Sequence, residues 1–307
     1  MRSPVDENPA TLEARVEELQ GQYTDCDLCA HHCHVDRTAG EIGTCQVDEN
    51  VRIGSYGPHF GEEKPLSGHA GSGTIFLAHC NLACVFCQNY ELSQEPRGAS
   101  EASVADIADI ALSLQEKGCH NINFVTPTHH SPTLARAVLD ARDRGLEVPI
   151  VWNCGGYENA DIVEHLDGIV DIYMPDVKWS LEEPARKYSK APGYWAAAKS
   201  ALKTMHEQVG DLTLDRNGIA ERGMLVRHLV MPGYVENSTR VVEFIAKEVS
   251  TATYLNLMAQ YRPAYKVGRH GRYEEINRRP TRAEYEEVVK TARDAGLTRL
   301  DVDSFLS

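Results

Sequence analysis

Apolar residues follow two different spacings along most of this 307-residue chain. From about residue 72, short apolar runs are typical of buried strands, and the segments between them have the pattern of amphipathic helices. The six runs are SGTIFLAH, NINFV, VPIVW, IVDIYM, MLVRHLVM and ATYLNLM. Strands that alternate with helices predict a parallel sheet joined by right-handed crossovers. We therefore expect an α/β fold, and six repeats favour a partial (β/α)6 barrel over a closed eight-fold barrel.

Capping residues mark where the helices are expected to begin. Asn8-Pro9 is a helix-start pair, and apolar residues at helical spacing after it predict a helix over about residues 9–22. Within the alternating region, helix starts are predicted at Ser103, Ser131, Ser180 and Thr281. Three of these starts have an acidic residue three positions later, as a capping box requires, namely Asp106, Glu183 and Glu284.

The segment between the first helix and the first strand has a different character. Residues 23–70 are rich in Cys, His and Gly and are expected to be mostly loop. They contain too few apolar residues to hold a core alone, so a bound metal would supply the missing stability. We therefore divide the chain into an N-terminal helix and Cys-rich metal module (residues 1–70) and a barrel with a C-terminal helix (residues 71–307).

Charge and hydropathy narrow the classes of partner. The chain has 45 acidic against 31 Lys and Arg residues, a formal charge of −14. A general nucleic-acid binder would show a basic footprint, so none is expected here. The late basic stretch between Arg269 and Arg282 is interpreted as a solvated loop that leads into a helix. No stretch approaches the roughly 20 apolar residues that span a bilayer, and the N-terminus lacks an apolar signal region, so we expect a cytoplasmic protein without a membrane partner.

Nine cysteines are the main chemical signal in the sequence. The cytosol keeps thiols reduced, so disulfides are not expected. Seven of the nine fall into two tight groups, and such clustering indicates metal ligation.

The second group follows the first predicted strand of the barrel. Cys80, Cys84 and Cys87 have C-x3-C-x2-C spacing in the loop where barrel enzymes carry their active sites. Three thiolates can bind a [4Fe-4S] cluster and leave one iron open to a reacting partner. The alternative is zinc, which requires four ligands in closed tetrahedral geometry and fits three Cys poorly.

This motif, with an aromatic residue before its last Cys, resembles the signature of the radical S-adenosylmethionine (SAM) superfamily. From about residue 20 onward the chain is also similar to the PflX group, which is related to pyruvate formate-lyase activating enzyme. The segments that carry the similarity are HFGEEKPLSGHAGSGTIFLAHCNLACVFCQNYELSQ, VTPTHH, NCGGYE, DIYMPDVKW, RHLVMPG and LMAQY. The resemblance implies an oxidoreductase in which the cluster cleaves SAM reductively to a 5′-deoxyadenosyl radical, which abstracts a hydrogen atom from a substrate. It also implies a reducing electron donor such as flavodoxin or ferredoxin.

The resemblance further implies which residues contact SAM. Phe86 corresponds to an aromatic residue near the SAM adenine, and Asp176 and Lys178 resemble an Asp-x-Lys turn that contacts SAM. His228 has a family counterpart near SAM, although a lone His in an apolar strand is often a satisfied core residue. Asn153 follows the third strand and is expected at the same site.

One expected SAM contact departs from the family pattern. The second strand of radical SAM enzymes usually ends in a Gly-Gly-Glu-like turn that binds the SAM amino group, and here the sequence is VTPTHH. The hydroxyls of Thr126 and Thr128 can still accept from an ammonium. The alternative is a strand-end turn that caps the next helix.

The first cysteine group has four members, at C-x2-C-x3-C-x11-C spacing. Four thiolates form a closed site for Zn²⁺ or for a second [4Fe-4S] cluster, and spacing does not separate the two. Interleaved His residues could replace a ligand, although solvent-facing His is the simpler interpretation. The predicted ligands are Cys26, Cys29, Cys33 and Cys45.

Two substrate classes are consistent with these features. The resemblance suggests a glycyl radical enzyme partner, which an activating enzyme would oxidise. A small-molecule substrate is the alternative, as in a sugar epimerase, with Cys154 at the end of the third strand returning a hydrogen atom to the substrate radical. An inert lining role for Cys154 remains open. A non-catalytic iron–sulfur or zinc protein is the most distant hypothesis.

Overall fold

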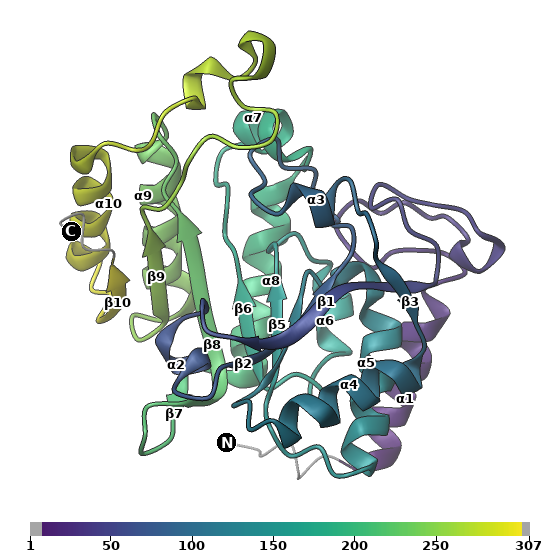
Figure 1. Ribbon diagram of the computed structural model, residues 1–307. Coiled ribbons are helices and arrows are strands. Elements are labelled where there is room, and N and C mark those ends of the chain that lie inside the picture. Colours follow the sequence, from purple (N-terminus) through teal and green to yellow (C-terminus); the bar gives the residue numbers. More distant parts are fainter. Residues whose placement is uncertain (1–7, 303–307) are drawn as a thin grey trace.

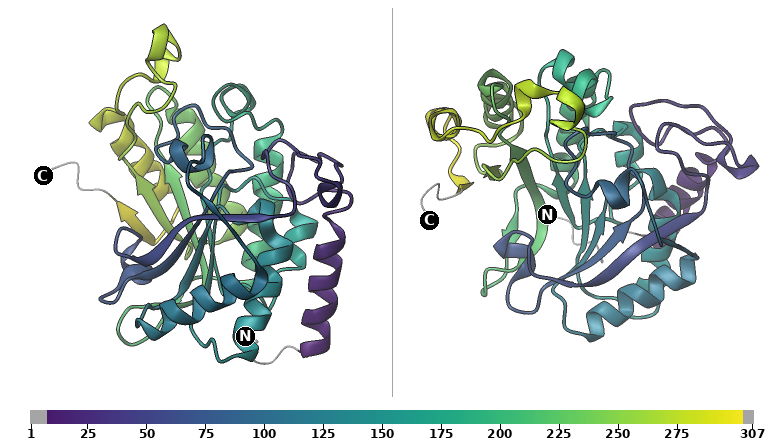
Figure 2. Two further views of the ribbon diagram at one scale, coloured as in Figure 1. Left: turned by 45° about the vertical axis from the view of Figure 1, so that its right-hand side comes forward. Right: turned by 45° about the horizontal axis from the view of Figure 1, so that its top comes forward.

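The computed structural model describes residues 8–302, which form one curved, mostly parallel sheet with helices around its outside (Figures 1 and 2). The strand order is β10-β9-β8-β6-β5-β4-β2-β1-β3, and β7 pairs with β8. The neighbours from β2 to β10 on this path are parallel, whereas β1 and β3 are antiparallel. The strands are β1 Val51–His59, β2 Ser72–Leu77, β3 Ser100–Ala102, β4 Ile122–Val125, β5 Ile150–Cys154, β6 Ile172–Pro175, β7 Thr213–Leu214, β8 Ala220–Leu229, β9 Tyr254–Met258 and β10 Arg299–Val302.

The six strands expected from the apolar runs are β2, β4, β5, β6, β8 and β9, so the predicted partial barrel is confirmed. Helices alternate with these strands along the chain, as parallel pairing requires. The α-helices are α1 Pro9–Gly21, α2 Lys64–Ser67, α3 Tyr90–Ser93, α4 Val104–Glu116, α5 Ser131–Asp143, α6 Ala160–Glu164, α7 Glu182–Pro184, α8 Tyr194–Val209, α9 Val235–Phe244 and α10 Arg282–Asp294. Within the described residues, no helix combines the length and apolar character needed to cross a membrane.

Two capping boxes form as predicted, one at Ser103 with Asp106 and one at Thr281 with Glu284. In each box the hydroxyl accepts from a backbone N–H and the carboxylate accepts from the cap residue, which satisfies two donors that the helix leaves free. The start at Ser131 is also correct, although a 3₁₀ turn over Thr128–His130 precedes it.

The predicted helix after Ser180 begins two residues later, at Glu182, and Leu181 rather than Ser180 is its cap residue. The Ser180 hydroxyl donates instead to the carbonyl of Asn237 at 2.8 Å, so a tertiary contact replaces the helix cap. Only the short α7 and a π-turn over Ala185–Ser189 follow, and the long helix α8 begins after Gly193, whose φ is +67°.

Residues 23–70 were expected to be mostly loop, and residues 51–59 depart from that expectation. This segment forms β1, which pairs with β2 along six registered positions from Ile53 to His59. Gly54, Gly57 and Pro58 weaken its strand pattern, and pairing with a buried neighbour overrides that weakness. The segment outside the sheet is therefore shorter than residues 1–70, and Figure 2 shows its loops (purple) beside the carboxyl ends of the strands.

Candidate active site

A large pocket lies at the carboxyl ends of the parallel strands, where the fold places the loop after β2. Cys80, Cys84 and Cys87 all line it. It holds about 1210 Å³ of empty space, part of it open to solvent.

The three thiols of this loop are the donor set that a [4Fe-4S] cluster with one open iron requires. Cys84 Sγ donates to Ser189 Oγ at 3.1 Å, and Cys87 Sγ lies 3.1 Å from Ser93 Oγ. Burial raises the pKa of the Cys84 thiol to about 11, and the nearby Lys178 ammonium opposes that rise. The fit to this cluster therefore rests on the three thiols as its ligands, and the Lys178 ammonium beside them would offset part of the negative charge that ligation requires.

Strained backbone borders the pocket at two strand ends. His79 precedes Cys80 with φ +68°, and Thr126 lines the pocket with φ +61°. A β-branched residue is a genuine outlier in this region of backbone space. Such strain is held in place by surrounding structure and is concentrated at functional sites.

One wall of the pocket carries partly buried charges, which we call the charged wall: Glu62, Asp176, Lys178 and Arg227. Arg227 is at its centre, with Nε donating to Asp176 Oδ1 at 2.6 Å and Nη1 donating to Glu62 Oε2 at 3.2 Å. Nη2 also donates to Asn153 Oδ1 at 2.7 Å. Lys178 Nζ donates to the second Asp176 oxygen at 2.6 Å. The wall thus ties together the ends of β5, β6 and β8.

The ionisation of the charged wall follows from these contacts. Burial alone would raise the pKa of Asp176, but Arg227 and Lys178 outweigh it and lower the pKa to about 2. Burial also raises the pKa of Glu62, and Arg227 opposes that shift. Asp176 is therefore an anion held between two cations at neutral pH.

Most residues predicted for SAM or catalysis line the same pocket as the three thiols. Its aromatic member, Phe86, contacts the rings of Trp179 and Tyr261 at centroid distances of 6.0 and 5.9 Å. The predicted residues found in the pocket wall are Phe86, Thr126, Asn153, Cys154, Asp176 and Lys178.

Two predicted residues are not in the pocket wall. His228 is fully buried, with Nδ1 donating to the Val177 carbonyl at 2.6 Å and Nε2 lying 2.8 Å from Ser238 Oγ. Successive side chains of a strand point to opposite faces, so Arg227 reaches the pocket and His228 packs on the other side. Thr128 is also buried, and its hydroxyl donates to Glu158 at 2.8 Å.

The structure adds Arg227 and Glu62 to the predicted residues. A charged residue inside the apolar run MLVRHLVM was the available signal for Arg227. The signal for Glu62 was its place in HFGEEKPLSG, the start of a segment similar to the PflX group, three residues beyond the end of β1.

Cys154 has a buried acidic neighbour. Burial raises the pKa of Glu158 to about 7, and hydrogen bonds from Thr128 and Cys154 oppose that rise. Cys154 is 2% exposed and lines the pocket, whereas Glu158 is 4% exposed and is not part of the pocket wall.

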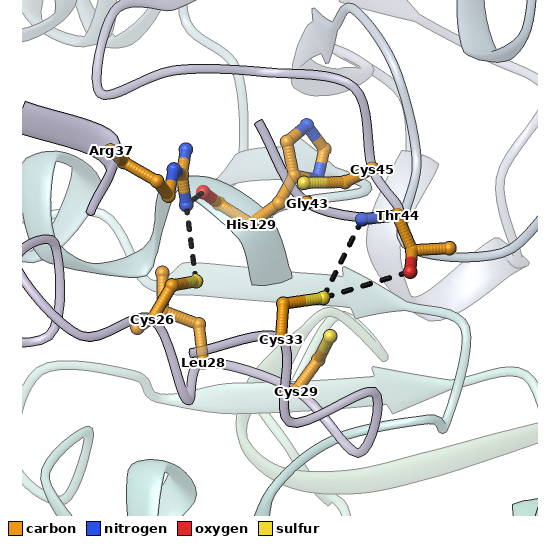
Figure 3. Close-up of a pocket in the computed structure, with 9 residues that line it drawn as sticks. All are labelled: Cys26, Leu28, Cys29, Cys33, Arg37, Gly43, Thr44, Cys45 and His129. Atoms are coloured by element: carbon orange, nitrogen blue, oxygen red, sulfur yellow. Dashed lines mark hydrogen bonds between the residues drawn. The ribbon is translucent and has the colours of Figure 1, made fainter. Parts of the chain in front are cut away.

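The N-terminal cysteines surround a second, smaller cavity (Figure 3). Its wall contains Cys26, Cys29, Cys33 and Cys45 together with Arg37 and His129. In the described part of the chain, no group of three or more His, Cys, Asp or Glu side chains is arranged to hold a metal ion. Backbone pairing of Cys29 with Glu158 joins this segment to the end of β5.

Comparison with protein families agrees with this geometry. The sequence model described as the Radical SAM superfamily matches residues 74–245, more than half of the chain. The uncharacterized protein MJ0674 of Methanocaldococcus jannaschii is 32% identical over 303 residues, which cover 96% of this chain and 81% of that protein. A second protein of the same organism, MJ0808, is 23% identical over 82% of this chain and 74% of its own length.

Solved structures share the fold at low sequence identity. The radical SAM methyltransferase TsrM from Kitasatospora setae superposes with a TM-score of 0.52 at 14% identity, over 76% of this chain and 55% of TsrM. The hydrogenase maturase HydG from Carboxydothermus hydrogenoformans gives 0.51 at 12% identity, over 75% of this chain and 52% of HydG. This chain therefore spans about half the length of these structures, and the likeness shows the fold alone.

Proposed function

Since the chain belongs to the radical SAM superfamily, we propose that Cys80, Cys84 and Cys87 ligate its [4Fe-4S] cluster and that SAM binds along the charged wall. When bound and reduced by one electron from a donor such as flavodoxin or ferredoxin, the cluster supplies reductive cleavage of SAM to methionine and a 5′-deoxyadenosyl radical. The three thiols and the charged wall line one pocket, which supports this arrangement.

Each part of the pocket wall has a proposed task. Lys178 and Arg227 offer charge-assisted hydrogen bonds to the SAM carboxylate, and Asp176 keeps both cations in place. Asp176 also has the acceptor character that ribose hydroxyls need. Phe86 provides an aromatic face for the adenine, and Thr126 provides a hydroxyl for the amino group.

The pocket supports a small-molecule substrate best, and the position of Cys154 carries this proposal. Its thiol lines the same pocket as the three cluster cysteines and donates to Glu158 behind it. A thiol there is placed to give a hydrogen atom to a carbon radical formed in the pocket. Cys154 is then the residue that completes the reaction on the substrate.

A protein substrate is the second candidate, suggested by the motifs similar to those of glycyl radical activating enzymes. Tyr56 and Phe60 are 51% and 64% exposed, and they flank His59, which lines the pocket. Exposed apolar side chains beside a pocket are a feature of protein-binding surfaces.

An experiment without any substrate tests the role of Cys154. SAM is cleaved by the reconstituted enzyme in D₂O, with dithionite as reductant and no added thiol. The S–D bond of exchanged Cys154 breaks, a C–D bond forms at C5′, and dithionite then reduces the thiyl radical left on Cys154. Wild type is expected to yield 5′-deoxyadenosine that carries one deuterium.

The variant and its control separate the two substrate classes. Cys154→Ala is expected to lower the deuterated fraction several-fold without abolishing SAM cleavage. Cys119→Ala is the matched control, because Cys119 is equally buried at 2% exposure and lies outside the pocket wall. Equal deuterium in Cys154→Ala and wild type would refute the donor role and favour a protein substrate.

A further inference from the structure

The loop between β9 and α10 is basic, although the chain as a whole is acidic. Residues 262–282 contain seven Lys and Arg residues against two Glu, whereas the formal charge of the chain is −14. Figure 1 shows this loop (yellow-green) at the carboxyl ends of the strands. None of residues 262–282, all of which the structure describes, lines the pocket. The charge of the loop therefore lies outside the proposed site for SAM and substrate.

Three of these cations lie on one tight turn, and we call them the basic patch: Lys266, Arg269 and Arg272. Backbone hydrogen bonds close the turn, from Gly268 N to the Arg272 carbonyl at 2.9 Å and from Arg272 N to the Arg269 carbonyl at 3.2 Å. All three residues are exposed, and none of them forms an ion pair within residues 8–302. Three cations held together without acidic neighbours attract an anionic partner.

Basic residues later in the same loop differ from the basic patch, because acidic neighbours neutralise them. Arg278 pairs with Glu284 at 2.7 Å, and Arg282 pairs with Glu286 at 2.7 Å. Such pairs leave little net charge to attract another molecule. The basic patch is therefore the part of the loop whose charge can contribute to binding.

The turn that carries the basic patch is attached to the loop of the three cluster cysteines. Lys266 N donates to the carbonyl of Val85 at 2.9 Å, and Val85 lies inside the C-x3-C-x2-C motif. The short helix α3 follows this motif directly, and its Ser93 hydroxyl lies 3.1 Å from Cys87 Sγ. A molecule bound at the basic patch is therefore beside the segment that holds the cluster ligands.

Two stacked rings make a second contact between the basic patch and α3. Tyr265 stacks on Tyr90, with a centroid distance of 4.7 Å and an interplanar angle of 12°. Lys266 Nζ lies 4.7 Å from the centroid of the Tyr265 ring, and Arg269 Cζ lies 5.8 Å from that of Tyr90. These cation–π contacts position both side chains and leave their charges exposed to a partner.

We propose that the basic patch docks the protein that reduces the cluster, and that this protein is an acidic one-electron carrier. The inference rests on the proposed function, because the patch lies beside a redox centre only if Cys80, Cys84 and Cys87 hold the cluster. The pocket side of their loop is assigned to SAM and substrate, so the electron arrives from the other side, where the patch is attached. The carrier loses one electron and is oxidised, and the cluster gains that electron and is reduced. Complementary charge raises the rate of encounter between two proteins, and salt screens it.

Binding measurements test the docking surface without any turnover. A flavodoxin and a ferredoxin, both acidic, are titrated calorimetrically into the reconstituted, oxidised enzyme at low and high salt. The Lys266/Arg269/Arg272→Gln variant is expected to bind the carrier at least about tenfold more weakly than wild type at low salt, with a smaller difference at high salt. Its iron content and circular dichroism spectrum check that it is folded and loaded.

A matched control removes the same charge from the opposite end of the barrel. Lys117, Arg216 and Arg293 are exposed, form no ion pair among the described residues, and lie on segments that lead into the amino ends of β4, β8 and β10. Lys117/Arg216/Arg293→Gln is expected to bind the carrier within about twofold of wild type, because its charges are far from the cluster loop. Equal losses in the two variants, or no binding of either carrier to wild type, would overturn the proposal. An oligonucleotide that binds wild type more tightly than both carriers, and loses affinity in the patch variant, would assign the patch to nucleic acid and overturn it as well.

The rate of cluster reduction gives a second readout. Each protein is mixed rapidly with the reduced carrier, and the loss of cluster absorbance is followed. Reduction of the patch variant at low carrier concentration is expected to be about tenfold slower than that of wild type and of the control variant. Equal rates in the three proteins would contradict docking at the patch. Dithionite is a small reductant that needs no docking surface, so 5′-deoxyadenosine formed by wild type with dithionite tests the proposed function separately.

Discussion

Replacement of Arg227 by Met is the perturbation that probes the charged wall most directly. The Arg227 side chain is 16% exposed and makes three short polar contacts, to Asp176, Asn153 and Glu62. Hydrogen bonds to charged groups contribute about 1.5–3 kcal/mol each. Adding these contributions for all three contacts would overstate the loss of stability, because Lys178 still pairs with Asp176 after the substitution. Breaking a buried ion pair costs about 3–5 kcal/mol, and we expect R227M to lose about that much stability.

Urea unfolding of the reconstituted protein, followed by tryptophan fluorescence at pH 7, measures the loss. Arg186→Met is the matched control, because the Arg186 side chain is 63% exposed and pairs with Glu182 on the surface. Exposed pairs contribute about 0–1 kcal/mol, so R186M is expected to remain close to wild type. A loss below about 1 kcal/mol in R227M, or equal losses in the two variants, would refute the description of Arg227 as the centre of a buried network.

The same variant tests the proposed cofactor contact. Loss of one charge-assisted hydrogen bond to the SAM carboxylate is expected to weaken SAM binding at least tenfold, which corresponds to about 1.4 kcal/mol. Equilibrium binding of SAM to the oxidised enzyme measures this change in affinity, because SAM is not cleaved without an electron. Unchanged affinity in folded R227M would remove Arg227 from the SAM site.

Three further substitutions test other parts of the account. Burial lowers the pKa of His228 to about 4, so the unfolded chain takes up a proton below about pH 6.5 that folded His228 does not. The free energy of unfolding of the wild type should therefore fall as the pH is lowered from 6.5 to 4, by up to about 1.4 kcal/mol per pH unit from this group. Urea titrations at several pH values should show that the unfolding free energy of His228→Gln depends less steeply on pH over this range. Gly156 has φ +72°, and Gly156→Ala would place a Cβ 2.7 Å from the carbonyl oxygen of Asp176, just after β6. A clear drop in the urea midpoint is therefore expected. Gly218→Ala is the control for backbone strain alone, because Gly218 has φ +82° and a Cβ there would meet nothing within 4 Å. Tyr157→Phe removes a hydroxyl that lies 2.8 Å from the Ala30 carbonyl and 2.6 Å from the Pro192 carbonyl, so its one proton is shared between the two segments. Hydrogen exchange should show faster opening of residues 26–34 than in wild type, whereas unchanged exchange would contradict the role of this hydroxyl.

The barrel was predictable because its central strands, such as β5 and β6, are buried on both faces. Such strands appear as mostly apolar runs, and all six predicted runs correspond to observed strands. The capping boxes at Ser103 and Thr281 were predictable because the two partners of each box lie only three positions apart in the sequence. The pocket position of Cys80, Cys84 and Cys87 followed from their place after the first parallel strand.

The errors came from contacts between distant segments. β1 contains two glycines and a proline, so its pairing with β2 and β3 and not its own pattern makes it a strand. The turn after β1 then carries Glu62 into the pocket wall. Ser180 has the sequence of a cap, but Asn237 takes its hydroxyl. Arg227 and His228 are adjacent in the chain, and the phase of β8 decided which of them faces the pocket.

Reductive cleavage of SAM by the reconstituted enzyme tests the central claim most directly. Wild type, Cys80/Cys84/Cys87→Ala and Cys119→Ala are reduced with dithionite under anaerobic conditions, and 5′-deoxyadenosine is quantified by mass spectrometry. We predict 5′-deoxyadenosine from wild type and Cys119→Ala and none above background from the triple variant. Its absence in wild type that carries a reduced cluster, or its persistence in the triple variant, would contradict the assignment of these three cysteines to a radical SAM cluster.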